Sequence, residues 1–190
     1  SNSMAIPINI EDLLNKRKIE SNRIEFKKGW NPDKIYRTIC AFANDFDNIG
    51  GGYIVVGIEE EERTGIAKRP VTGVPIEALN DIQKDMVGYN NKIEPYYMPR
   101  IDVQEVDGKS VLVIWAPAGV NRPYNVRERV TAKQSPSKWY IRSGTSTIEA
   151  KGEVLDELRE MANRTPFDER GNERIEITDI SPTLVLGLSL

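Results

Sequence analysis

The sequence predicts an α+β fold, with a small mixed or antiparallel sheet and helices packed against it. Three patterns support this prediction: helical apolar stripes, one continuous run of strand-forming residues, and two alternating runs around an Asp-Gly pair. The chain has 190 residues, of which 39% are hydrophobic. This is enough apolar material for one domain with a sizeable core.

The N-terminal half is expected to hold two helices and two strands. Apolar residues at helical spacing predict a short helix within residues 8–19, and the alternating "RIEFK" (23–27) predicts a short strand. Asn31-Pro32 is a helix start, with asparagine as the cap and proline at the first position. The apolar run "GYIVVGI" (52–58) is typical of a central, buried strand.

In the C-terminal half, "PIEALNDIQKDMV" (75–87) predicts a second amphipathic helix. Two alternating runs flank Asp107-Gly108, a preferred type I′ turn, and predict a β-hairpin over 100–117. "WYIRSG" (139–144) predicts a further strand, and "EVLDELREMAN" (153–163) a last helix. Strand alternation places Tyr140 and Arg142 on one face, expected to be exposed, and Trp139 on the other, expected to be buried.

Two residue counts restrict the chemistry. The chain has no histidine and a single cysteine, Cys40, which excludes histidine-based catalysis, disulfides within the chain and multi-cysteine zinc sites. A bound metal would be a hard ion held by oxygen atoms, such as Mg²⁺ or Mn²⁺. No apolar run is long enough for a membrane span, and the start does not have the pattern of a signal peptide, so we expect a cytoplasmic protein without membrane contact.

Charge is unevenly distributed along the chain. The formal net charge is −3, yet residues 16–38 hold eight Lys and Arg against three acidic residues, and residues 120–145 hold six against one. If the two segments converge, they form one patch for a polyanion; the alternative is an ordinary charged surface. Arginines of the second segment stand among aromatic residues, as on surfaces that bind single strands.

Three smaller features are candidate sites. Gly50, Gly51 and Gly52 form a tight turn whose amides are candidates for holding a phosphate. Glu59 and Glu60 follow the central strand, where functional residues often lie. Glu20 and Glu25 meet in neither a helix nor a straight strand, and converge only if the chain bends at Ser21-Asn22.

Four segments agree in order and spacing with a known family. "IESNRIEFKKG", "TICAFANDFDNIGGGYIVVGIEE", "RPYNVRERV" and "WYIRSGTST" resemble the Schlafen AlbA-type domain, over roughly residues 10–163. The resemblance implies a small mixed sheet with helices and two alternative activities. One is nucleic-acid binding in bacterial transcriptional regulators. The other is RNA cleavage by a metal-dependent three-carboxylate site, here Glu20, Glu25 and Glu59 or Glu60 with Mg²⁺ or Mn²⁺.

The leading hypothesis is a domain that contacts the phosphate backbone of DNA or RNA. Its predicted contacts come from both basic segments: Lys27, Lys28, Arg37, Arg122, Arg127, Arg129, Tyr140 and Arg142. The first alternative is the ribonuclease, and the second is an assembly module that forms a homodimer without nucleic acid. Residues 1–9 are expected to be an expression remnant and N-terminal tail. Residues 164–190, which end in an apolar tail, are expected to be a linker to a further C-terminal domain.

Overall fold

The structure, a computed structural model, describes residues 6–163, which form four α-helices and two four-stranded sheets. The helices are α1 (Ile10–Leu14), α2 (Pro32–Asn44), α3 (Ile76–Tyr89) and α4 (Gly152–Glu160). The first sheet has the order β1 (Ile24–Lys27), β2 (Gly52–Val56), β5 (Lys109–Ala116) and β4 (Arg100–Val106). The second has the order β3 (Ile93–Glu94), β6 (Asn125–Arg127), β7 (Ser137–Ser143) and β8 (Ser146–Glu149).

The first sheet is mixed and buries both of its faces. β1 pairs with β2 in parallel, whereas β2–β5 and β5–β4 are antiparallel. Alternate residues of β2 therefore enter two different cores. Ile54 and Val56 pack toward α2 and α3, and Tyr53 and Val55 pack toward α1 and the segment that follows β2. Burial on both faces explains why β2 is a continuous apolar run.

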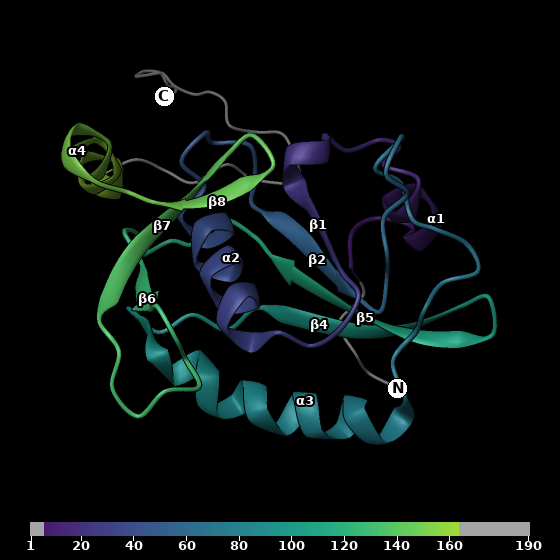
Figure 1. Cartoon of the computed structure of the whole chain (residues 1–190). Helices are drawn as coiled ribbons and strands as arrows, with labels where there is room; N and C mark the ends of the chain where they lie inside the picture. The colour runs from purple at the N-terminus through teal and green to yellow at the C-terminus, as the bar shows by residue number, and fades with distance from the viewer. Residues whose placement is uncertain (1–5, 164–190) are drawn as a thin grey trace, which may run out of the picture.

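Helix α2 lies between the two sheets and is the centre of the molecule (Figure 1). It contacts β7, β6 and β8 on one side and β2 and β5 on the other. Its cap is as the sequence predicts, because Asn31 Oδ1 accepts a hydrogen bond from the Lys34 amide and Pro32 is the first helical residue. From Thr38 to Asn44 every side chain is buried, so only the first turns of α2 reach solvent.

The second sheet is covered by α2 on one face and by α4 on the other (Figure 1). Tyr140 belongs to the core around α2, whereas Ile141 and the half-buried Trp139 pack with Leu158 of α4. Tyr140 and Arg142 are 5% and 8% exposed. The expectation that these two side chains are exposed was therefore wrong, because a helix covers their face of the strand.

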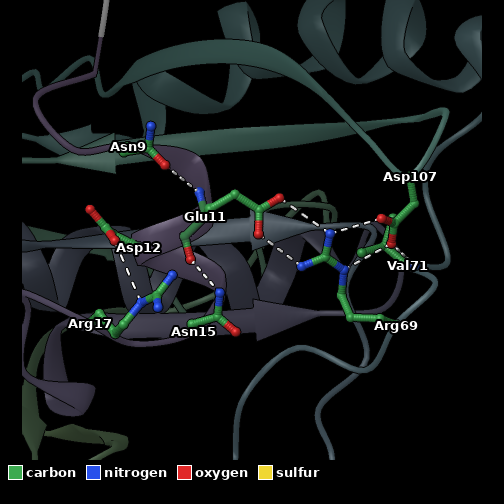
Figure 2. A network of polar contacts seen from close by, with 8 residues as sticks. All are labelled: Asn9, Glu11, Asp12, Asn15, Arg17, Arg69, Val71 and Asp107. Atoms are coloured by element: carbon green, nitrogen blue, oxygen red, sulfur yellow. Dashed lines mark hydrogen bonds and ion pairs between the residues drawn. The ribbon is translucent and has the colours of Figure 1, made fainter.

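One arginine joins three distant segments at the end of the first sheet. Arg69 donates to both carboxylate oxygens of Asp107, in the β4–β5 turn, and to both oxygens of Glu11 in α1 (Figure 2). The Val71 amide also donates to Asp107. The hydrogen bonds from Arg69 lower the pKa of Asp107 to about 2. Asp107 therefore fixes both its own turn and the chain that covers the sheet.

The predicted α+β class is confirmed. The Asp107-Gly108 hairpin is also confirmed, and both turn residues have the positive φ that a type I′ turn requires.

Helix α1 is shorter than expected, because the chain enters the left-handed region at Lys16, with φ 54°. The sequence did not indicate β3, β6 or β8, nor that the strands divide into two sheets. None of the helices described between residues 6 and 163 could cross a bilayer. The predicted apolar tail lies outside these residues.

The environment of Cys40 gives the first prediction. This thiol is fully buried in α2, and burial raises its pKa to about 12. Since the thiolate is the reactive form, a disulfide reagent near pH 8 should not label the folded protein. One thiol per chain should react once denaturant unfolds it, with absorbance of the released thiol as the readout. Rapid labelling under native conditions would contradict the burial of α2.

Candidate nucleic-acid interface

The two basic segments of the sequence meet along α2. The chain after β6 is tied to the start of the helix, since the Thr131 amide and hydroxyl both donate to Asp33. The Arg37 guanidinium donates to the carbonyl of Glu128. The β7–β8 hairpin is held at the next residue of α2 by a 2.9 Å hydrogen bond between the Thr38 and Thr147 hydroxyls. Residues about 100 positions apart thus line one surface.

This surface is a groove made of two adjoining clefts, which share Lys34 and Arg37. The first cleft, of about 330 Å³, lies between β1, α2 and the β7–β8 hairpin. Its other lining residues are Glu25, Lys27, Thr38, Arg142, Thr145, Ser146 and Thr147. The second cleft, of about 500 Å³, lies between α2 and β6–β7. Its other lining residues are Asn31, Asp33, Glu128, Arg129, Lys138, Tyr140 and Glu149.

The groove carries more cations than anions, and the excess is concentrated in the first cleft. That cleft has four Lys and Arg side chains and one carboxylate, whereas the second cleft has four Lys and Arg side chains and three carboxylates. In the second cleft two of the four cations are in ion pairs: Arg129 with Asp33 at 3.8 Å, and Lys138 with Glu128 at 3.2 Å. Lys34 is exposed and forms no ion pair with any residue between 6 and 163.

Glu25 and Arg142 form the floor of the first cleft. The parallel register sets Glu25 opposite Ile54, which turns its carboxylate toward α2. Arg142 Nη1 donates to Glu25 Oε1 at 3.0 Å and to the Thr147 hydroxyl at 3.0 Å, and its guanidinium lies 4.8 Å from the centre of the Phe42 ring. Burial lowers the pKa of Arg142, and Glu25 acts in the opposite direction by stabilising the charged form.

The candidate metal-binding carboxylates are not gathered into one cluster. The predicted bend is present as a 3₁₀ turn at Ser21–Arg23, but Glu20 is exposed at its start. Glu60 pairs with Lys16, which lies over the Phe26 ring on the α1 side of the sheet, the face opposite Glu25. Glu59 pairs with Lys28 and Lys68 on the outside.

Both oxygens of Glu25 already face cations, Oε1 to Arg142 and Oε2 to Lys27 at 3.4 Å. No three Asp, Glu or Cys side chains in the described part of the chain are placed to hold a metal ion. The residues present therefore do not fit the Mg²⁺ or Mn²⁺ site that the resemblance implied for Glu20, Glu25 and Glu59 or Glu60.

Comparison with known proteins identifies the family. The family model described as Schlafen, AlbA_2 matches residues 20–151, which include β1, α2 and the whole groove. The chain belongs to the Schlafen AlbA_2 family. No curated protein matches the sequence.

Two solved structures are similar to this Schlafen AlbA_2 domain. The DIP2311 protein from Corynebacterium diphtheriae has 18% identity and a TM-score of 0.51, over 84% of this chain and 32% of that one. This likeness supports the fold, and the chain spans about a third of the length of DIP2311. The N-terminal domain of a protein from Nitrosomonas europaea, described as ATP-dependent DNA helicase RecG-related, has 27% identity and a TM-score of 0.48. That match covers 71% of this chain and 88% of the domain.

In the glycine turn of this Schlafen AlbA_2 domain, the backbone amides bind a carboxylate of the same chain. Asp45, which ends α2 in the left-handed conformation, accepts hydrogen bonds from the amides of Ile49, Gly50 and Gly51. A side chain at Gly51 would come within 2.1 Å of the Ala116 carbonyl, so glycine is required there by close packing. The Gly50 and Gly51 amides proposed for phosphate are thus occupied by Asp45, and Gly52 packs directly on Phe42.

Two further residues predicted to contact nucleic acid lie in the interior. Arg122 is 4% exposed and donates to the carbonyls of Asn44 and Asp45, so its role is to complete the end of α2. Tyr140 is buried, and its ring is not free to stack on a base. Burial also raises the pKa of Tyr140 to about 12. Of the other predicted residues, Lys27, Arg37, Arg129 and Arg142 line the groove, whereas Lys28 and Arg127 lie outside it.

The site also contains residues that sequence reasoning did not single out. The sequence marks Lys34 and Lys138 only as members of the basic segments, and it does not single out the hydroxyls of Thr38, Thr145, Ser146 and Thr147. One signal was available: Lys34 and Arg37 are three residues apart, so they share one face of a helix. The hydroxyls of Thr145, Ser146 and Thr147 have no comparable signal, because they reach the cleft through the pairing of β7 with β8.

The Glu25–Arg142 pair gives a second prediction. Replacing Glu25 by Gln leaves a largely buried guanidinium without its counter-charge and should lower the free energy of unfolding by about 2 kcal/mol. The matched control is Glu149→Gln in β8, whose partners Lys138 and Lys151 are more exposed; it should cost under about 1 kcal/mol. Urea unfolding monitored by circular dichroism measures both. Equal effects would contradict a structural role for Glu25.

A third prediction concerns the glycine turn. Asn tolerates the left-handed backbone of Asp45, so Asp45→Asn isolates the loss of charge beside three amides and Arg122. The expected loss of stability is about 3 kcal/mol in urea unfolding. Asp47→Asn, in the same loop but exposed, should change stability by no more than about 0.5 kcal/mol. A small effect at Asp45 would show that the turn does not depend on its charge.

Proposed function

We propose that this domain binds DNA or RNA through its phosphate backbone, along the groove between α2 and the second sheet. The observation that carries the proposal is the convergence of both basic segments on one face of α2, in a chain whose net charge is negative. A phosphate chain attracted to this face meets Lys34 and Arg37, which both clefts share, and Arg129 and Lys138 in the second cleft.

The pairing of these cations sets the expected strength of binding. Arg129 and Lys138 must exchange their carboxylate partners for phosphates, whereas Lys34 has no described partner to give up. Net gain therefore comes mainly from Lys34 and Arg37. We expect a moderate affinity that falls steeply with salt, because each phosphate contact releases counterions.

The wider setting of the domain is also part of the proposal. Family resemblance suggests a bacterial transcriptional regulator in which this domain supplies nucleic-acid binding and a further C-terminal domain follows. The length of DIP2311, about three times the matched region, is consistent with such domains occurring within longer proteins. The apolar residues 184–190, predicted to support a homodimer, lie outside the described part of the chain.

The fourth prediction tests the groove directly. In fluorescence anisotropy with single- and double-stranded oligonucleotides, the double variant Lys34→Gln/Arg37→Gln should weaken binding about tenfold at low salt. The slope of log K against log salt, measured from about 50 to 200 mM, should fall by about one to two, since two phosphate contacts are lost. The measurement covers DNA and RNA in parallel.

Two controls make this test specific. Lys109→Gln removes an exposed lysine at the start of β5 that lines neither cleft, and should leave the affinity unchanged. Binding should also persist in EDTA, because its donors are side-chain cations. Salt-independent binding, or equal losses for Lys109→Gln and the groove variant, would refute the proposal. Metal-dependent RNA cleavage abolished by Glu25→Gln would instead favour the ribonuclease alternative.

A further inference from the structure

The first cleft differs from a groove that only binds a nucleic-acid backbone. A strand that passes along such a groove presents phosphodiesters, each with one negative charge, and evenly spaced cations are sufficient to bind it. Here, the positive charge is concentrated at one end of the groove, where Lys27, Lys34, Arg37 and Arg142 face a single carboxylate, Glu25. This local excess suits a ligand group with more than one negative charge.

Hydroxyl groups complete the cleft. β7 and β8 are joined by the two residues Gly144 and Thr145, so the hairpin tip brings Thr145 and Ser146 to the same cleft as Lys34 and Arg37. Both side chains are exposed, and neither is hydrogen-bonded to another residue between 6 and 163. A terminal phosphate has three oxygens that accept such hydrogen bonds, whereas a phosphodiester has two that are not esterified.

The hairpin tip is fixed in position. Thr147 is bonded to Thr38 of α2 at 2.9 Å and accepts from Arg142 at 3.0 Å, and Arg142 is in turn held by Glu25. These bonds hold the hairpin against α2 before a ligand arrives, which reduces the backbone entropy lost on binding. A volume of about 330 Å³ is near the lower end of ligand pockets, about 300–1,000 Å³, and leaves room for more than a single ion.

We propose that the first cleft binds a phosphate monoester, the terminal phosphate of a nucleic-acid strand, between Lys34, Arg37 and the Thr145–Ser146 hairpin tip. The inference rests on the proposed function and extends it, because the groove would then recognise the end of a strand as well as bind its backbone. The same chemistry would accept a free nucleoside monophosphate, which the experiment separates from a strand end.

The fifth prediction follows. Internally labelled oligonucleotides of one sequence are prepared with a 5′-phosphate, a 3′-phosphate or only hydroxyl ends, and their affinities for the 190-residue chain are compared at constant salt. One of the two phosphorylated ends should bind about tenfold more tightly than the hydroxyl-ended strand, the gain expected for one charge-assisted hydrogen-bond cluster. Adenosine monophosphate and inorganic phosphate serve as competitors.

Paired variants locate the effect. Thr145→Ala/Ser146→Ala should reduce the tenfold preference to under about threefold. Ser137→Ala, which replaces an exposed serine at the other end of β7, should keep this preference.

Competition by adenosine monophosphate at concentrations that leave hydroxyl-ended strands bound also supports a monoester site. If tight binding of the monophosphate persists while no oligonucleotide binds, the site serves free nucleotides and the proposed backbone function fails. Equal affinities for all three strands, without competition by the monophosphate, overturn this inference but leave backbone binding intact.

Discussion

The structure depends on the burial of α2 between two sheets that share no strand. The link is Asn44, a fully buried side chain near the end of the helix. Its amide donates to the carbonyls of Tyr124 and Tyr140 at 3.0 and 2.8 Å, and its oxygen accepts from the Tyr124 amide at 2.7 Å. A buried amide with all these bonds made fixes both the distance and the rotation of the second sheet against the helix. Asp45 and Arg122 then close the same helix end with charge.

The groove is a consequence of this arrangement. With its C-terminal half enclosed, α2 can present only its first turns to solvent, and those turns hold Asp33, Lys34 and Arg37. The second sheet, fixed by Asn44, brings β7–β8 and the chain after β6 against them. Positive charge gathers there because the only exposed part of the central helix is basic and the strands next to it are basic too. The same packing that hides Arg122 and Tyr140 therefore creates the candidate site.

The sequence predicts local structure here better than it predicts the site. Asn31-Pro32, Asp107-Gly108 and the run of β2 each act through backbone preferences of a few neighbouring residues, and each is found as expected. β3, β6 and β8 have two to four residues each and obtain their pairing from distant strands, so no local pattern marks them. Burial of Arg142 and Arg122 was missed for a related reason. Arginine is usually exposed, and only its partners Glu25 and Asp45, 117 and 77 positions away, make these burials possible.

Glu25 shows how one partner can change what a carboxylate does. A carboxylate beside others, with free oxygens, attracts a divalent ion; a carboxylate that faces a guanidinium and an ammonium is already neutralised. Arg142 lies in β7, which places it beside Glu25, so the position of the second sheet decides between these states. In the present arrangement the pair removes one negative charge from the floor of the first cleft. Lys34 and Arg37 are then opposed by no free carboxylate within that cleft. With Glu25 as its one lining carboxylate, and that carboxylate paired in this way, the first cleft is suited to an anion.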